Sequence, residues 1–204
     1  MAILLSMGII AFAPPLRVDR GAVPHAASPT MMAKSEALPF LEKPATLDGS
    51  MAGDVGFDPL FLSEAYSIKW MREAELKHGR ICMLAFVGYV AVDCGIRAPG
   101  APAGISSLAA HDYTVKTGHM LALLFTVGIF EALAYNAISE MMSGETDRAP
   151  GDYGFDPLGY SAGKDEATKA DYALKEITHC RAAMIGFAGI VTQSALKGIG
   201  FPYF

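Results

Sequence analysis

Two segments of the chain carry glutamate, histidine and arginine at the same spacing, i, i+3 and i+5. The residues are Glu75, His78 and Arg80 in the first segment and Glu176, His179 and Arg181 in the second. Residues three apart share a face of an α-helix, so each glutamate lies beside its histidine. A carboxylate oxygen and an imidazole nitrogen are both metal ligands. The pattern therefore predicts two places where a helix offers donors to a metal ion.

The two arginines point away from the glutamates of their own helices, because five residues correspond to a rotation of about 140°. Both motifs lie in apolar segments, and an unpaired charge in mid-membrane costs about 2.5–3.5 kcal/mol. Exchange between the helices removes this cost symmetrically, by pairing Glu75 with Arg181 and Arg80 with Glu176. Each glutamate then keeps one free carboxylate oxygen, and each neighbouring histidine keeps one free nitrogen. Such donors suit a metal ion that takes most of its ligands from a group other than the protein.

Two further polar residues could act as donors. Gln193 follows His179 by fourteen residues, which places it about 40° off the same helix face and about 21 Å along the axis. Glu131 lies within Ala122–Ala137, a stretch that is otherwise almost wholly apolar. An intramembrane acid of this kind needs a bound cation or a partner from another helix.

The motifs belong to an internal repeat. The turn-rich stretch Gly53–Leu60 matches Gly151–Leu158 at an offset of 98, and Glu75–Met83 matches Glu176–Met184 at an offset of 101. Each copy is thus a loop followed by a helix. Two copies that cross a membrane in the same direction predict a pseudo-twofold axis along the membrane normal.

Three membrane-length helices are predicted to position these residues, at about 63–94, 115–142 and 167–197. The segments between them, 98–104 and 143–151, are rich in glycine, proline or polar residues. We therefore expect an all-α membrane protein with short amphipathic segments. Its first and third helices form the crossed pair, and the second helix returns through the membrane.

Composition agrees with a membrane protein: 52% of residues are hydrophobic, 18% are charged and the mean hydropathy is +0.31. The net charge of −5 with scattered basic residues argues against nucleic acid as a partner. Basic residues flank the starts of the first and third helices, which predicts a cytoplasm-like side for the N-terminus. They are Lys69, Arg72, Lys77, Lys164, Lys169 and Lys175.

Residues 1–34 read as a targeting remnant that is removed or poorly ordered, which leaves 35–204 as the folded domain. An apolar run, Ile3–Ala13, precedes Pro14-Pro15 and a segment with a single acidic residue. The run is too short to span a bilayer, which takes about 20 residues.

These motifs resemble the light-harvesting chlorophyll-binding family. Glu75-Leu-Lys-His78-Gly-Arg80 and Glu176-Ile-Thr-His179-Cys-Arg181 are similar to its two repeat-helix motifs, and the likeness extends over about 38–198. The resemblance implies that Arg80 and Arg181 form the cross-helix pairs and that six residues are axial ligands of chlorophyll magnesium. Those six are Glu75, His78, Glu131, Glu176, His179 and Gln193.

The resemblance also implies a function, a location and partners. The protein would be an antenna without enzymatic activity that passes excitation energy to a photosystem core (I or II). It would lie in the plastid (chloroplast) thylakoid membrane among thylakoid lipids and neighbouring antenna subunits, with a stromal N-terminus. Carotenoids would end at the two Gly-Phe-Asp-Pro loops.

The stretch 38–54 and the short chain end resemble the chlorophyll a/c branch of red-lineage algae, the fucoxanthin- or peridinin-type antennas. Ala11–Pro14 likewise resembles the phenylalanine motif of plastid presequences in that lineage. This finer resemblance implies chlorophyll a, chlorophyll c and carotenoids of the fucoxanthin or peridinin and diadinoxanthin-like types.

Two positions depart from the family pattern. Many members have asparagine where His179 stands, and histidine is the stronger magnesium ligand. The second helix also lacks the glutamine or glutamate that many members carry about two turns before Glu131. His119 is a candidate replacement, although it lies twelve residues from Glu131, about 120° around the helix.

Three alternatives remain at this point. An energy-dissipating member of the same family would carry the same residues. Two Glu-x-x-His helices are also found in di-iron carboxylate bundles, but those need two further glutamates, and here only Glu131 is spare. Intramembrane charges can mark an ion path in a transporter, but charges that cancel in pairs do not line a cavity.

Overall fold

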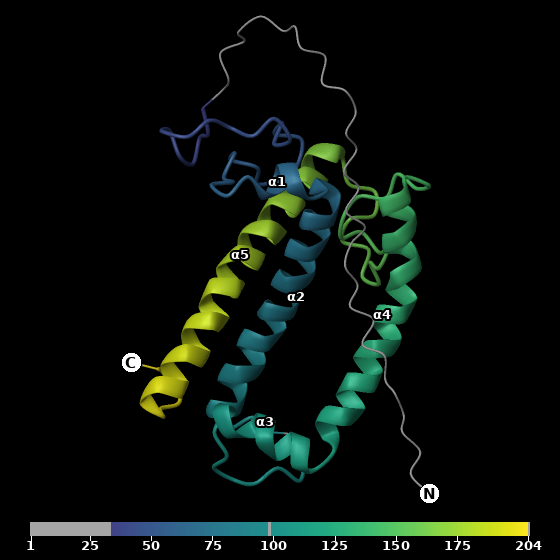
Figure 1. Ribbon diagram of the computed structural model, residues 1–204. Helices are drawn as coiled ribbons and strands as arrows, with labels where there is room; N and C mark the ends of the chain where they lie inside the picture. The colour runs from purple at the N-terminus through teal and green to yellow at the C-terminus, as the bar shows by residue number, and fades with distance from the viewer. Residues whose placement is uncertain (1–33, 98, 204) are drawn as a thin grey trace, which may run out of the picture.

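The computed structural model describes residues 34–97 and 99–203, so the predicted targeting remnant at 1–34 lies almost wholly outside the described residues. Within the described ranges the protein is helical and has no named strand; an isolated antiparallel bridge joins Lys34 to Glu42. The all-α prediction is confirmed for these ranges. The helices are α1 Leu62–Ala65, α2 Ile68–Asp93, α3 Ser107–Lys116, α4 His119–Ser143 and α5 Glu166–Lys197 (Figure 1).

Helices α2 and α5 lie side by side and run in the same direction, as the internal repeat predicts (Figure 1). Their contact is formed by a small core of Leu76, Ile177 and Cys180. Gly79 lies directly against Cys180, because a Cβ atom added to the glycine would be 2.2 Å from the cysteine Cβ. Leu76 and Ile177 are equivalent at the repeat offset of 101, as are Gly79 and Cys180. The pseudo-twofold axis therefore passes through this contact.

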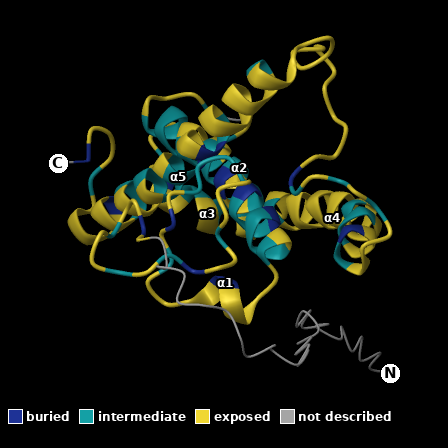
Figure 2. Cartoon of the chain, turned by 90° about the horizontal axis from the view of Figure 1, so that it is seen from above, coloured by how far each residue is buried: buried dark blue, intermediate teal, exposed yellow. Residues whose placement is uncertain are grey.

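Helix α4 stands apart from that pair, and most of its surface is exposed (Figures 1 and 2). Met141, near its C-terminal end, is its buried residue. Among the described helices, α4 alone is long and apolar enough by composition to cross a membrane, with a mean hydropathy of 1.8 over its most apolar window. The charged motifs keep α2 and α5 below that criterion.

The helix boundaries differ from the sequence prediction where the backbone turns. The first predicted helix is interrupted, because Tyr66 is extended and separates α1 from α2. The second begins later than predicted, because Gly118 adopts a φ of 81° that ends the preceding turn and starts α4 at His119. The third, predicted at 167–197, agrees with α5 to within one residue.

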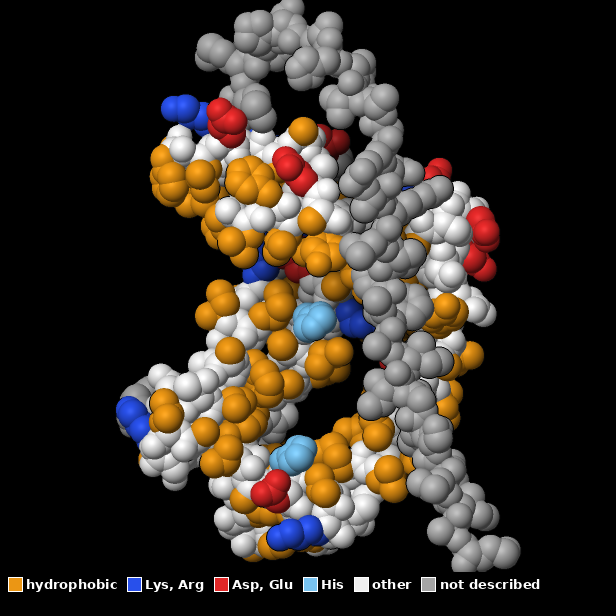
Figure 3. Space-filling view, viewed as in Figure 1, with side chains coloured by type: hydrophobic (Ala, Val, Ile, Leu, Met, Phe, Trp, Pro, Cys, Tyr) orange, Lys and Arg blue, Asp and Glu red, His pale blue; other side chains and the backbone are white. Residues whose placement is uncertain are grey.

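Large apolar side chains cover much of the helical surface (Figure 3). On α2, Leu84 is 78% exposed, and on α5 Ile185 is 77% exposed. Continuous apolar exposure of this extent marks surface that a membrane, a partner or an apolar ligand covers.

Candidate functional site

The structure forms both predicted ion pairs between α2 and α5. Arg181 Nε lies 2.8 Å from Glu75 Oε1, and Arg80 Nε lies 2.7 Å from Glu176 Oε1. Each acid is thus neutralised by a base on the opposite helix. The predicted exchange is confirmed, and it joins the two repeats at their centre.

Each arginine also fixes the loop of its partner repeat. Arg181 Nη1 donates to the carbonyl of Gly53 at 2.8 Å, and Arg80 Nη1 donates to the carbonyl of Gly151 at 2.7 Å. Both glycines have positive φ, and a Cβ atom at Gly151 would lie 2.4 Å from Leu76 Cδ1. Glycine is therefore required here for backbone conformation and for close packing against the helix.

The two motif histidines are oriented in the same way. Nδ1 of His78 lies 2.7 Å from the carbonyl oxygen of Ala74, and Nδ1 of His179 lies 2.7 Å from that of Lys175. A carbonyl only accepts, so Nδ1 carries a proton in each ring, and in the neutral tautomer the lone pair lies on Nε2. Both side chains are exposed. The helices thus present two orientated imidazole donors to the apolar surroundings.

The second carboxylate oxygens of the motif glutamates differ. No hydrogen bond or ion pair within the described residues involves Glu176 Oε2. Glu75 Oε2, however, lies 3.2 Å from Arg72 Nη1. The prediction of a free oxygen is therefore wrong for Glu75, because Arg72 on the preceding turn of α2 shares its charge. Ala173 stands at the equivalent position in the second repeat.

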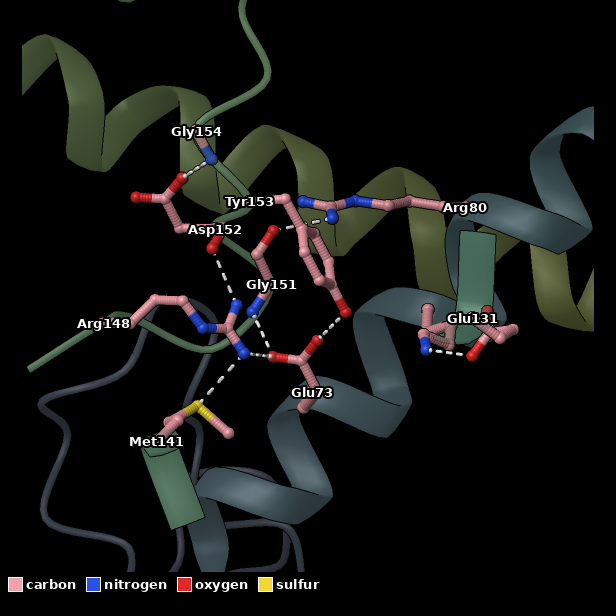
Figure 4. Close-up of polar contacts among 10 residues, drawn as sticks. Glu73, Arg80, Glu131, Met141, Arg148, Gly151, Asp152, Tyr153 and Gly154 are labelled. Atoms are coloured by element: carbon pink, nitrogen blue, oxygen red, sulfur yellow. Dashed lines mark hydrogen bonds and ion pairs between the residues drawn. The ribbon is translucent and has the colours of Figure 1, made fainter. Parts of the chain in front are cut away.

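Glu131 has its partner on another helix. Lys77 Nζ on α2 lies 2.7 Å from Glu131 Oε2 (Figure 4). The sequence predicted a cation or an interhelical partner, and the structure supplies the lysine. Thr178 occupies the position of Lys77 in the second repeat, so this contact attaches α4 to the first repeat.

The remaining predicted donors lie away from the contact between α2 and α5. Gln193 is exposed on α5, and no hydrogen bond or ion pair within the described residues involves its side chain. His119 begins α4, where its Nδ1 lies 2.7 Å from the hydroxyl of Thr117. The structure thus gathers the six motif residues and leaves Glu131, Gln193 and His119 as separate positions.

A cavity of about 910 Å³ lies beneath the first repeat loop. Its lining includes His78 and Glu75 together with apolar side chains of the loop and of α2, such as Phe57 and Met71. Concave, mainly apolar sites with a few placed polar groups are typical of cofactor sites. The residues present therefore fit a large apolar cofactor whose metal takes one axial donor from the protein.

Sequence reasoning missed a buried acid, Glu73. Its Oε2 accepts from the amide of Gly151 at 2.6 Å and from Arg148 Nη2 at 3.0 Å, while the hydroxyl of Tyr153 donates to Oε1 (Figure 4). Burial and then this bond to Glu73 raise the pKa of Tyr153 to about 12. Leu174 stands at the repeat equivalent, so a search for repeated motifs passes over Glu73. The sequence feature that could have indicated a role for Glu73 is its charge, because an acidic residue inside a membrane helix needs a partner.

A second missed cluster lies at the other end of α2. Asp93 accepts from the amide and the hydroxyl of Ser107 at 2.8 and 2.9 Å, and from the hydroxyl of Tyr203 at 2.8 Å. Tyr203 is buried, and this burial, followed by the contact with Asp93, raises its pKa. The chain end is thereby tied to the junction of α2 and α3. No pattern in the sequence indicated this contact.

The geometry describes an all-helical scaffold that presents metal donors on an apolar surface, and comparison with known proteins shows which family has this scaffold. The family model described as "Chlorophyll A-B binding protein" matches residues 43–195. The chain therefore belongs to the chlorophyll a/b-binding protein family, which confirms the resemblance and the pigment-binding, light-harvesting role at the level of that family.

Individual relatives agree. Chlorophyll a-b binding protein 6 of Arabidopsis thaliana is 34% identical over 177 residues, which cover 80% of this chain and 70% of the relative. Chlorophyll a-b binding protein 1B-21 of Hordeum vulgare is 33% identical over 202 residues, which cover 92% of this chain and 80% of the relative. Photosystem I chlorophyll a/b-binding protein 5 of Arabidopsis thaliana is 31% identical over 185 residues, which cover 80% of this chain and 71% of the relative. All three are plant proteins named for chlorophylls a and b, so the chlorophyll a/c branch stays a prediction.

Proposed function

We propose that this protein is a light-harvesting antenna of the plastid thylakoid membrane that holds chlorophylls and carotenoids and passes excitation energy to a photosystem. The observation that carries the proposal is the pair of histidines, His78 and His179. Each is fixed through Nδ1 and presents Nε2 to an apolar surface, and each stands one turn from an ion pair that neutralises the helix.

The chain's part in this function is to place donors and exclude water. His78 and His179 would each offer Nε2 to a chlorophyll magnesium, and Glu176 would offer its free Oε2. Glu75 and Glu131 would each offer a remaining lone pair of a carboxylate that Arg72 or Lys77 also contacts. Gln193 and His119 would reach pigments nearer the far ends of α5 and α4. Bound chlorophyll supplies the light absorption and the transfer of excitation.

The ion pairs support a three-span arrangement in which α2 and α5 cross the membrane beside α4. Each exchanged pair removes two charges from the lipid interior, so the cost of inserting these helices falls. The basic residues at the starts of α2 and α5 support a stromal N-terminus. Neighbouring antenna subunits and a photosystem core, I or II, are the proposed partners.

The pigment set we propose is chlorophyll a, chlorophyll c and carotenoids of the fucoxanthin or peridinin and diadinoxanthin-like types. The support is the resemblance of the stretch 38–54 to red-lineage antennas. Extraction of the pigments and their separation by chromatography tests it, and a preparation that holds chlorophyll b without chlorophyll c would contradict it.

Absorption of the protein purified in mild detergent is the primary test of the antenna role. We expect chlorophyll bands, and a colourless protein or one coloured only by iron would refute the proposal. His78→Ala and His179→Ala should each remove about one chlorophyll per protein, because each removes one axial donor. His111→Ala is the matched control and should leave the pigment count unchanged, since that exposed side chain contacts Asp112 on its own helix, α3.

The di-iron alternative is weakened by the same contacts. Both motif glutamates bind arginine, and nowhere in the described part of the chain do three histidine, cysteine or acidic side chains gather as a metal cluster would require.

A further inference from the structure

The first repeat loop is covered by the stretch 34–51, which we call the N-terminal segment. The hydroxyl of Ser35 donates to the carbonyl of Gly56 at 2.6 Å, and the amide of Ala37 donates to the carbonyl of Val55 at 3.1 Å. The segment also reaches Asp54, whose Oδ2 accepts from the amide of Gly49 at 2.7 Å. Lys43 and Thr46 add to this cover: Lys43 Nζ lies 3.7 Å from Asp54 Oδ2, and the hydroxyl of Thr46 donates to Ser63 at 2.7 Å.

The second repeat loop has the same internal structure. Oδ1 of Asp152 accepts from the amide of Gly154 at 2.8 Å, as Oδ1 of Asp54 does from Gly56 at 2.8 Å. The φ angles of the two glycines, 65° and 68°, also agree. The two loops therefore present equivalent hydrogen-bond acceptors along the same edge.

In the second loop no described residue fills that edge. Oδ2 of Asp152 and the carbonyls of Tyr153 and Gly154 receive no donor from 34–97 or 99–203, and in Figure 4 the second carboxylate oxygen of Asp152 points away from its neighbours. The contacts of this loop with the rest of the protein lie on its inner side, where Arg148 donates to the Asp152 carbonyl and Glu73 accepts from the Tyr153 hydroxyl.

Space and exposure show the same difference. A Cβ atom at Gly56 would lie 3.1 Å from Lys43 Cγ and 3.3 Å from Ser35 Oγ, whereas one at Gly154 would meet nothing within 4 Å. Phe155 is 85% exposed, against 59% for the equivalent Phe57. Among the residues that the structure describes, none takes on the second loop the place that the N-terminal segment takes on the first.

We propose that the outer edge of the second loop, residues 152–158, is a docking site for an extended, lysine-bearing segment of a neighbouring polypeptide. That segment adds to the second loop as residues 34–51 add to the first. Backbone and hydroxyl donors satisfy the carbonyls of Tyr153 and Gly154, in the manner of peptides that bind through main-chain hydrogen bonds. A lysine neutralises Asp152, whose carboxylate has no cation among the described residues. This interaction goes beyond pigment binding and does not depend on it.

The test uses the full chain purified in mild detergent and a fluorescent synthetic peptide with the sequence of residues 34–51. We expect saturable binding that a scrambled peptide does not show. Asp152→Asn should weaken binding about tenfold, because it removes a charge-assisted contact while its amide oxygen still accepts from Gly154. A peptide carrying Lys43→Gln should bind the unaltered protein about as weakly, and should lose little more on the Asp152→Asn protein.

Asp112→Asn, on the exposed face of α3, is the matched control and should leave the peptide affinity unchanged. Binding no stronger than that of the scrambled peptide, or equal affinity of the unaltered and Asp152→Asn proteins, would overturn the proposal. So would binding that responds to Asp54→Asn instead, because the peptide would then be exchanging at the first loop. The visible absorption of each preparation reports folding and pigment binding separately, so failure of the docking site is distinguishable from failure of the antenna role.

Discussion

The two repeats of this protein are alike where they face each other and different where they face the rest of the chain. At their contact, each supplies one arginine, one glutamate and one loop glycine in equivalent geometry, and each carries one exposed histidine beside that contact. Away from it, only the first repeat has Glu73, Arg72 and Lys77, and only its loop is covered by the N-terminal segment.

The difference shows how a symmetric pair holds an asymmetric third helix. Lys77 binds Glu131 of α4, and Glu73 binds Arg148 just beyond the end of α4. Both contacts attach α4 to α2, and the residues at equivalent positions of α5, Thr178 and Leu174, could not make them. The symmetric contacts therefore build the helix pair, and the unmatched charges select the side on which α4 lies.

The largest expected effect comes from breaking the symmetric contacts. Arg80→Leu leaves Glu176 with an unbalanced charge inside the helix pair, and Arg181→Leu leaves Glu75 with Arg72 of its own helix as its remaining partner. We expect each to lower the yield of pigmented protein at least tenfold, measured as chlorophyll absorption per purified protein. Arg181→Lys, which keeps the charge, should retain a measurable yield. Normal yield from either leucine variant would contradict the pairing, and a greater loss from Arg181→Leu than from Arg80→Leu would contradict the charge sharing between Arg72 and Glu75.

The next effect concerns the contact on the pseudo-twofold axis. Gly79→Ala places a Cβ atom 2.2 Å from Cys180 Cβ, so α2 and α5 must separate. We expect a loss of about 2–3 kcal/mol in the free energy of unfolding, as for an overpacked core, measured by thermal loss of pigment circular dichroism. Cys180→Gly in the same chain should restore part of it, because only one of these two equivalent positions has room for a side chain. No recovery would show that the backbone contact matters more than the cysteine.

A smaller effect is expected from Glu73, which only the first repeat carries and which contacts the second loop. Glu73→Gln removes the charge that Arg148 and the second loop share, and we expect a loss of about 1.5–3 kcal/mol, as for hydrogen bonds to charged groups. Hydrogen–deuterium exchange should increase at 148–154 and stay unchanged at 53–56. Glu64→Gln, on the exposed face of α1, is the control. Equal increases in both loops would show that Glu73 acts on the whole helix pair.

The smallest expected effect is that of low pH on the two repeat loops. Hydrogen bonds from the hydroxyl and the amide of Ser161 hold the pKa of Asp156 below its ordinary value of 3.8. Burial works to raise the pKa of Asp58, but hydrogen bonds from Ser63 and Leu62 lower it below the same value. A carboxylate with a lowered pKa stabilises the fold fully above its unfolded pKa, and this contribution is lost as pH falls through the folded value.

Both loops should therefore be unchanged between pH 7 and pH 5 and should open only below about pH 4. Amide exchange should rise first in the second loop, because the N-terminal segment still covers the first. Exchange that rises at pH 5, or first in the first loop, would contradict this account.

The sequence by itself determined the helix pair and its central contacts. A glutamate and an arginine at i and i+5 in an apolar segment need partners of opposite charge. Because the motif repeats at an offset of 101, pairing each glutamate with the arginine of the other helix is the symmetric arrangement. The positions of His78 and His179 follow from the same helical spacing, and the family follows from the motifs. These features depend on local periodicity and on repetition, which a sequence displays directly.

Tertiary structure alone decided the unmatched contacts. Glu73 with Tyr153, Lys77 with Glu131 and Asp93 with Tyr203 each join residues that are far apart in the chain and have no equivalent pair in the other repeat. Such pairs form only when folding brings particular side chains together, so the spacing of residues along the chain does not encode them.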